Sequence, residues 1–230
     1  MKGVHFKYTN VSGDITEWTF PVTVNNSSSK LTLNDTYLTG DLTNWVISNG
    51  NSWLSIINDN ISIDMSKFHI ASECSVLHIN DDDDYTNEIN GDLTGLNIFP
   101  AIEGEYGFDY RLTYGELTGR MDNYIIPPGL TIAAKFYFRN NNITAMPRGA
   151  FDKVTLFSFT NNNCDTTEID AFLAYVDAYF VGATVPKQNA VYSLDGTGMG
   201  IPSAAGLASR TSILGKYTAA GKTCTISVNS

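Results

Sequence analysis

Four consecutive aspartates at positions 81–84 are the residues whose type and spacing most directly suggest chemistry. Carboxylate oxygens bind Ca²⁺, and an EF-hand loop also needs a glycine at its sixth position and a glutamate at its twelfth. No register through this run supplies both, since a loop that starts at Asn80 places Tyr85 and Gly91 at those positions. The run therefore favours a solvated turn over a cation site, and we expect no bound metal.

The histidines and cysteines do not add a metal or catalytic site. No two histidines stand at the spacing of metal ligands, and the cysteines are too widely spaced for a metal site or a disulfide framework. Free cysteines are among the most buried residue types, so we interpret all three as small buried hydrophobic side chains. The residues concerned are His5, His69, His78, Cys74, Cys164 and Cys224.

The sequence also lacks the short motifs of hydrolases, zinc peptidases and phosphate-binding loops. The stretch GTGMG at 196–200 lacks the full spacing of a nucleotide-binding fingerprint, so we interpret it as a turn. Glu103 and Glu105 stand close together, but nothing marks them as the carboxylate pair of a glycosidase. We therefore expect a protein that is not an enzyme and uses no cofactor, and an enzyme with a dispersed site on a β-rich scaffold is a weaker alternative.

The bulk composition narrows the range of partners. The chain has 230 residues, 43% of them apolar, and a net charge of −10. This acidic balance argues against a nucleic-acid partner and against an anionic membrane surface. No run of about 18 apolar residues is present, so we expect no membrane insertion. The N-terminal MKGVHFKYTN has no apolar stretch of the kind found in secretory signals, so we expect a protein that stays where it is made or leaves inside a virus particle.

Seven short alternating segments recur along the chain, and we call the two apolar residues of each segment its anchor pair. Successive pairs stand 23, 23, 33, 26, 21 and 35 residues apart. Five positions after the second anchor, six of the seven residues are apolar; three positions after it, six of the seven are small side chains that can accept a hydrogen bond. The pairs are Leu31-x-Leu33, Leu54-x-Ile56, Leu77-x-Ile79, Tyr110-x-Leu112, Phe136-x-Phe138, Phe157-x-Phe159 and Tyr192-x-Leu194.

The shared pattern, apolar-x-apolar-x-x-(Asn/Asp/Thr)-x-apolar, resembles the leucine-rich repeat, whose units run about 20 to 29 residues. The resemblance covers roughly residues 30–201 and implies an α/β repeat fold, a solenoid with a parallel β-sheet. Asp84 interrupts the third copy, aromatic residues replace leucine in later copies, and the usual preceding apolar residue is mostly missing, so the member is irregular. The alternative is an all-β sandwich of short strands with asparagine-rich turns.

A polar residue three positions after the strand has a physical role in such a repeat. The chain leaves the sheet there, and its freed backbone N–H and C=O groups need partners. An asparagine side chain both donates and accepts, so stacked copies can join the backbones of adjacent repeats. The predicted bridging residues are Asp59, Asp82, Asn141 and Asn162, whereas Asn140 and Asn142 are expected only to fit the turn.

The ends of the chain depart from the repeat, and we expect short helices in the C-terminal part. Residues 1–29 alternate around a turn at 12–14, which predicts an N-terminal β-hairpin cap, with its second strand over 15–24. Apolar residues at helical spacing predict one helix between Asp165 and Gly182 and another between Ser203 and Gly215, followed by a strand at 222–228. We expect one cooperative domain: the cap at 1–29, the solenoid at 30–201 and a helix-strand cap at 202–230. The acidic insertion at 80–109 is expected to form a loop.

The final stretch, from Tyr192 to Val228, is similar to the terminal repeat of leucine-rich-repeat-like proteins encoded by bacteriophages that infect Bacteroidetes. The shared features are a strand, a turn of small residues, Pro-Ser, a helix rich in alanine and glycine, a glycine and a last strand. This similarity covers under a fifth of the chain. It implies a protein of a phage particle.

If the anchor pairs face the interior, the residues beside them form the open face of the sheet. Tryptophan, tyrosine and arginine dominate the energetics of binding surfaces, so their presence there predicts a recognition patch. A solvated sheet with scattered aromatic residues is the alternative. The predicted patch consists of Trp53, Ile57, His78, Arg111, Tyr137 and Arg139.

Together these features favour a non-enzymatic binding or structural protein located in a bacteriophage virion. It would be a tail, fibre or capsid-decorating protein that binds another virion protein or a host surface, either a protein or a surface glycan. The alternative is a bacterial surface adhesion protein with leucine-rich repeats, located outside the cell or at its surface. Such proteins normally carry an export signal and often an anchoring domain, and neither is visible in this sequence.

Overall fold

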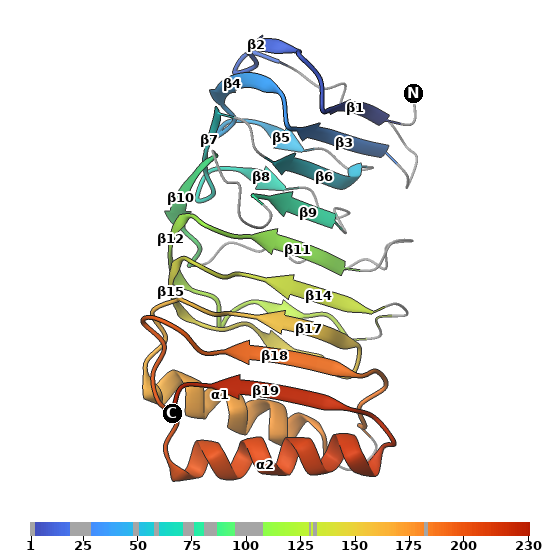
Figure 1. Cartoon of the computed structure of the whole chain (residues 1–230), viewed down its shortest axis with the longest axis vertical. Coiled ribbons are helices and arrows are strands. Elements are labelled where there is room, and N and C mark those ends of the chain that lie inside the picture. Colours follow the sequence, from blue (N-terminus) through green and yellow to red (C-terminus); the bar gives the residue numbers. More distant parts are fainter. Residues whose placement is uncertain are drawn as a thin grey trace.

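The computed structural model describes residues 3–18, 29–47, 51–57, 60–70, 76–80, 87–94, 108–128, 130, 133–181 and 184–230. Within them the chain forms mostly parallel β-sheet, together with two helices. Figure 1 shows the strands one above another along the long axis of the molecule, with the N-terminal strands at one end and the helices at the other.

The larger sheet has nine strands, which follow one another in chain order and pair in parallel. Successive side chains of each strand point alternately to the core and to the outer face. The outward residues are more exposed in β14 and β18 than in β9, where all four residues are buried. The strands are β1 (Gly3–Lys7), β3 (Ser29–Asn34), β6 (Asn51–Ile57), β9 (Val76–Ile79), β11 (Phe108–Leu112), β14 (Ala134–Tyr137), β17 (Val154–Ser158), β18 (Ala190–Leu194) and β19 (Cys224–Val228).

A second sheet of six strands also follows chain order, and each of its strands comes from the segment between two strands of the larger sheet. We call a strand of the larger sheet, with the chain that leads to the next one, a unit. The strands of the second sheet are β2 (Ser12–Asp14), β4 (Tyr37–Asp41), β7 (Asn60–Asp64), β10 (Glu88–Asp92), β12 (Glu116–Arg120) and β15 (Asn142–Ala145). Two short parallel pairs complete the described strands, namely β5 (Val46–Ile47) with β8 (His69–Ile70) and β13 (Ile125–Ile126) with β16 (Arg148–Gly149).

The seven predicted segments lie in or directly after β3, β6, β9, β11, β14, β17 and β18, and they pair in parallel within one sheet. Their first anchors are register partners from strand to strand, for example Leu31 with Leu54 and Tyr110 with Phe136. All the anchor residues are buried. This part of the prediction is confirmed. The alternative sandwich is wrong, because the segments are not divided between two facing sheets.

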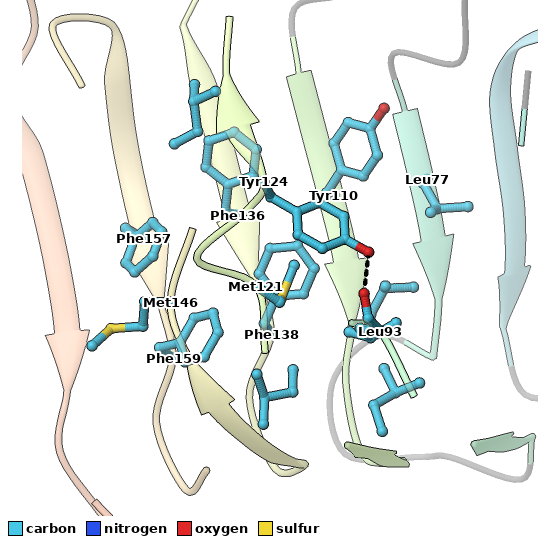
Figure 2. Packing of buried hydrophobic residues seen from close by; sticks show 14 of the residues in the cluster. Leu77, Leu93, Tyr110, Met121, Tyr124, Phe136, Phe138, Met146, Phe157 and Phe159 are labelled. Carbon is cyan, nitrogen blue, oxygen red and sulfur yellow. Dashed lines mark hydrogen bonds between the residues drawn. The ribbon is translucent and has the colours of Figure 1, made fainter. Parts of the chain in front are cut away.

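The core lies between the two sheets and continues under the helices. Figure 2 shows its central part, where Phe136 and Phe138 come from one unit and Phe157 and Phe159 from the next. The rings of Phe157 and Phe159 stack with centroids 5.6 Å apart. The buried Tyr124 hydroxyl donates to the Leu93 carbonyl at 2.6 Å, so its polar atom is satisfied inside the core.

The predicted N-terminal hairpin is wrong for the described residues. β1 pairs with β3 and β2 pairs with β4, both in parallel, so the two strands belong to different sheets. In place of the start of a second hairpin strand, Ile15 is buried and its N–H donates to the Thr39 carbonyl, after which the chain turns towards Trp18. Alternating apolar and polar residues fit both an antiparallel hairpin and parallel pairing with the next unit. Only the strands of the next unit decide between the two. The rest of the predicted strand, 19–24, lies outside the described residues.

The acidic insertion at 80–109 was predicted as a loop, and part of it is a strand. β10 lies within it and pairs with β7 and β12. The insertion is therefore longer than usual but still supplies one strand to the second sheet. The aspartates at 81–84 lie outside the described residues.

Helix α1 (Thr166–Tyr179) begins where the sequence predicts. Its N-cap Asp165 accepts a hydrogen bond from the Glu168 N–H at 2.8 Å. The predicted stop at Gly182 lies outside the described residues. The apolar side of α1 packs on the core, where Phe172 stacks on Phe157 with ring centroids 4.9 Å apart.

Helix α2 (Ala204–Ala219) also begins as predicted, with Ser203 as N-cap, but it does not stop at Gly215. A Cβ added at Gly215 would meet no atom within 4 Å. The position is exposed and the helix continues past it, because a glycine inside a helix costs only about 1 kcal/mol and packing of Ile213 and Tyr217 exceeds that cost. The last strand, β19, is confirmed.

Two asparagines join neighbouring units as the spacing predicts. The Asn141 side-chain nitrogen donates to the Leu112 carbonyl of the preceding unit at 2.9 Å, and its oxygen accepts from the Leu117 N–H. Asn162 makes the same two kinds of contact from the β17 unit to the β14 unit. Both side chains are buried, so these amides replace the backbone hydrogen bonds that end where the sheet ends.

The other two predicted bridging residues, Asp59 and Asp82, lie outside the described residues. Asn87 has the bridging role at that point, since its nitrogen donates to the Ile56 carbonyl and its oxygen accepts from the Ile61 N–H. It stands eight residues after the anchor Ile79 rather than three, because the insertion lengthens the turn.

A second series of side-chain hydrogen bonds between units, which the anchor spacing does not predict, runs along the C-terminal ends of strands of the six-stranded sheet. Asp14 accepts hydrogen bonds from the N–H and hydroxyl of Thr16, and the Thr16 hydroxyl oxygen accepts from the Asp41 N–H of the next unit at 3.0 Å. The same arrangement recurs one unit later, where the Thr43 N–H donates to the Asp41 carboxylate and the Thr43 hydroxyl oxygen accepts from the Asp64 N–H. The repeated signal in the sequence is G-D-x-T at 13–16, 40–43 and 91–94.

Candidate binding surface

The candidate site is the face of the nine-stranded sheet that points away from the core. The anchor residues lie on the opposite side of this sheet, where α1 packs on Phe157 and α2 packs on Tyr192. In Figure 1, α1 passes behind β19 and α2 lies below it. Alternation places the residues between and beside the anchors on the outer face. We call the following set the recognition face: His5, Lys7, Thr32, Asn34, Trp53, Ser55, Ile57, His78, Asp109, Arg111, Tyr137 and Arg139.

Register aligns part of this face into one row across five strands. Thr32 pairs with Ser55, Ser55 with His78, His78 with Arg111 and Arg111 with Tyr137. Neighbouring strands lie about 4.8 Å apart, so each side chain in the row lies beside the next. The order runs from small polar groups at the N-terminal strands to large charged and aromatic groups at β11 and β14.

The larger side chains contact one another in a continuous series. The Trp53 and His78 rings meet edge to face, with centroids 5.7 Å apart. His78 Nε2 lies 3.3 Å from Asp109 Oδ1, without the alignment of a hydrogen bond. Asp109 in turn receives two hydrogen bonds from Arg111, from Nε at 2.9 Å and from Nη2 at 3.1 Å.

The series continues over the ring of Tyr137. The guanidinium carbon of Arg111 lies 4.8 Å from the centroid of that ring, and that of Arg139 lies 5.9 Å from it. Arg139 is also 5.9 Å from the ring of Tyr114. These cation–π contacts hold two long side chains over one aromatic surface and order them before any partner arrives.

Asp109 is the carboxylate that fixes the middle of the series. Burial by itself raises its pKa, but the neighbouring His78 and the Arg111 guanidinium outweigh that effect and hold the pKa at about 2. Asp109 is therefore ionised at neutral pH. Its charge holds Arg111 in a planar, two-bond arrangement, with the guanidinium lying over Tyr137.

The structure brings the six predicted patch residues onto the same face of the sheet. Trp53 and Ile57 lie on β6, His78 on β9, Arg111 on β11, and Tyr137 and Arg139 on and just after β14. Their role in binding remains a prediction. The predicted set omits Asp109, His5 and Lys7, although the alternation D-x-R at 109–111 places the carboxylate on the same side as the arginine.

Other candidate chemistry is sparse among the described residues. No three His, Cys, Asp or Glu side chains within the described ranges come together in a way that could hold a metal ion. Cys164 is buried as predicted, and burial raises the pKa of its thiol to about 12. Cys224 is only partly buried, so the prediction is wrong there, because β19 is the last strand of its sheet. Cys74 lies outside the described residues.

Comparison with known proteins does not place the chain in a family. A scan against family models, a search of curated proteins and a search of solved structures each gave no match. Neither α1 nor α2 has the length and apolar character of a membrane-crossing helix, and these are the helices of the described residues.

Proposed function

We propose that the chain is an irregular leucine-rich-repeat-like solenoid that acts as a non-enzymatic binding protein, and that the recognition face contacts a protein partner. One observation carries the proposal, namely the unbroken series of contacts from Trp53 through Asp109 and Arg111 to Tyr137 and Arg139. The solenoid is supported by the parallel, in-register succession of units.

The series has the properties of a binding surface rather than of a solvated sheet. Tryptophan, tyrosine and arginine supply most of the affinity at protein interfaces. Their mutual contacts reduce the side-chain entropy that binding removes, which is about 0.5–1.5 kcal/mol for each long side chain. Arg111 and Arg139 lie over one tyrosine in an acidic protein, so an acidic or aromatic patch on the partner suits this part of the face.

We further propose that the protein belongs to a bacteriophage virion, as a tail, fibre or capsid-decorating component. The support is the order of elements at the C-terminus, where β18, a turn of small residues, the capped helix α2 and β19 follow one another as in the phage proteins that the sequence resembles. A bacterial surface adhesion protein is the alternative. Mass spectrometry of purified phage particles and of bacterial envelopes distinguishes the two proposals. Peptides of a virion protein should be found in the particles and not in the envelopes of uninfected cells, whereas an adhesion protein should give the opposite result.

The recognition face is tested by capture of a partner from dissociated particles. The double variant Tyr137→Ala with Arg139→Ala should capture its partner about 30-fold less well than the wild type, as expected for the loss of about 2 kcal/mol at a hot spot. The matched control is Ser193→Ala with Thr225→Ala, on β18 and β19 of the same sheet, which should capture normally. Equal capture by the wild type and the double variant rejects the proposed surface.

A further inference from the structure

A hollow of about 450 Å³ opens on the recognition face at its N-terminal end. Its lining comes from four neighbouring strands, β1, β3, β6 and β9. The volume lies within the range of small-ligand sites, roughly 300–1,000 Å³. The lining side chains that matter here are His5, Lys7, Asn34, Trp53, Ser55 and His78.

The hollow is a basic site in an acidic protein. It is lined by one lysine and two histidines, and none of the described residues that line it is Asp or Glu. The chain as a whole has a net charge of −10. The nearby carboxylate of Asp109 is held by Arg111 in two hydrogen bonds, so it does not neutralise Lys7. An anionic group is therefore attracted to this hollow although the protein as a whole is acidic.

The rest of the lining suits a sugar ring. The Ser55 hydroxyl and the Asn34 amide lie 3.0 Å apart, and His5 Nδ1 lies 3.1 Å from the Thr32 hydroxyl. Hydroxyl and amide groups both donate and accept, as the hydroxyls of a sugar do. Trp53 stands beside them and offers an indole surface for the C–H face of a pyranose.

One of the residues that line the hollow, His78, has a buried ring nitrogen without a hydrogen-bond partner. His78 is only 8% exposed, and its Nε2 makes no hydrogen bond within the protein, although Asp109 Oδ1 lies 3.3 Å away. A buried polar atom without a partner costs free energy, which a ligand oxygen recovers by bonding to it. His78 lines the hollow, so a ligand seated there is within its reach.

We propose that this hollow binds a pyranose that carries a carboxylate, such as the terminal uronic acid of a surface glycan. The Lys7 ammonium pairs with the carboxylate, Trp53 supports the ring, and Asn34, Ser55 and His78 bond to its oxygens. This assignment rests on the proposed role of the recognition face in binding. It adds a glycan subsite at the N-terminal end, separate from the protein-binding part around Tyr137.

Glucuronic acid, glucose, acetate and inorganic phosphate are the probes, titrated into the purified full chain and followed by saturation-transfer NMR. Glucuronic acid is a small polar ligand and should bind with a Kd of about 1 mM. Glucose lacks the carboxylate and acetate lacks the sugar ring, so each should bind about tenfold more weakly than glucuronic acid. No saturable binding of glucuronic acid, or equal binding of glucose, acetate or phosphate, overturns the proposal.

The variant Lys7→Gln should weaken glucuronic acid binding about fivefold to tenfold and leave glucose binding unchanged. Lys135→Gln removes the same charge from β14 of the same sheet and is the matched control, which should bind glucuronic acid normally. Equal affinity in the Lys7→Gln and Lys135→Gln variants contradicts the assigned role of Lys7 and overturns the proposal. Circular dichroism confirms that each variant is folded.

The variant Tyr137→Ala with Arg139→Ala separates this proposal from the proposed function. It leaves the hollow intact and should bind glucuronic acid as the wild type does, even where capture of a protein partner is lost. Loss of partner capture with normal sugar binding supports both assignments. Normal capture with normal sugar binding rejects the protein-binding surface and leaves the sugar subsite standing. Loss of sugar binding in this variant overturns the separate subsite.

Discussion

At the scale of single residues, the fold depends on amide side chains placed where the chain leaves the larger sheet. Asn162 is 2% exposed and bonds to the Phe138 carbonyl and the Ile143 N–H of the preceding unit. It therefore connects two units at a point where the sheet no longer does so. Its neighbour Asn163 is exposed, although the two residues are identical in type and adjacent in sequence.

This pair gives the first prediction. Asn162→Ala should lower the free energy of unfolding by about 2–4 kcal/mol, because it leaves a buried carbonyl and a buried N–H without partners. Asn163→Ala should change it by less than about 0.5 kcal/mol. Urea denaturation followed by circular dichroism measures both. Similar losses in the two variants would mean that the asparagine run acts through turn geometry rather than through bridging.

Asp109 gives a prediction about pH. Its pKa in the folded protein is about 2, below the value of 3.8 expected for an unfolded chain, so its contribution to stability is present above pH 3.8 and is lost as the pH falls towards 2. Because the side chain is partly open to solvent, we expect a contribution of about 1 kcal/mol.

The variant Asp109→Asn should therefore be less stable than the wild type by about 1 kcal/mol at pH 6, with the difference shrinking towards zero near pH 2. Urea midpoints at the two pH values give the comparison. A difference that stays constant, or grows as the pH falls, would show that the Asp109 charge does not stabilise the fold.

Residue spacing predicted some of these roles and missed others for physical reasons. Asn141 and Asn162 stand at a fixed offset from their anchors, so their bridging could be predicted. Asn140 has a positive φ of 58°, in keeping with the turn role expected of it. The D-x-R pattern places Asp109 beside Arg111 on one strand, but the importance of Asp109 also comes from His78. His78 lies on another strand, and no local pattern shows that contact.

At the scale of elements, α1 replaces a strand of the second sheet and must be fixed to the unit before it. Glu168 accepts from the Met146 N–H and from Arg148 Nη2, both at 2.9 Å. Arg148 also lies 5.7 Å from the rings of Phe172 and Tyr175 on the same helix. The helix is therefore held by one largely buried ion pair that lies against two aromatic rings.

The third prediction concerns this ion pair. Glu168→Ala should lower the free energy of unfolding by about 3 kcal/mol, because the largely buried Arg148 loses its charged partner and the Met146 N–H loses its acceptor. Glu168→Gln keeps an acceptor for the Met146 N–H and should lower the free energy of unfolding by less. The exposed pair Arg120–Asp122 is the control, and Asp122→Ala should cost at most about 0.5 kcal/mol. Equal losses at the buried and exposed pairs, measured in urea, would contradict the assigned role of Glu168.

The starts of the elements were more predictable than their ends. Asp165 and Ser203 cap their helices through their own side chains, so a local signal was sufficient. The end of α2 depends on the packing of Tyr217 beyond Gly215, which a glycine rule does not include. The N-terminal hairpin failed for a similar reason, since β1 and β2 are oriented by β3 and β4 rather than by the turn between them.

At the scale of the whole molecule, each strand of the larger sheet pairs only with its neighbours, so stability is a sum of contacts between adjacent units. The anchor pattern predicted this order, because the same residue class recurs at the same offset after six of the seven anchor pairs. The pattern did not reveal how unevenly the core is built. Aliphatic anchors fill the early units, whereas one aromatic cluster fills the later ones: Phe136, Phe138, Phe151, Phe157, Phe159, Phe172, Tyr192 and Tyr217.

This uneven core leads to the last prediction. Aromatic side chains bury more area than aliphatic ones, and α1 packs against α2 at the C-terminal end, so opening there requires more free energy than at β1 and β2. In native-state hydrogen exchange read by mass spectrometry, amides of β1–β4 should exchange first and those of β14–β18 last. Ile15→Ala should speed exchange only in the first units, whereas Phe157→Ala should speed it in β14–β18 and α1. One common rate for all units, equally affected by both substitutions, would mean that the chain opens all at once and that the uneven core does not divide it.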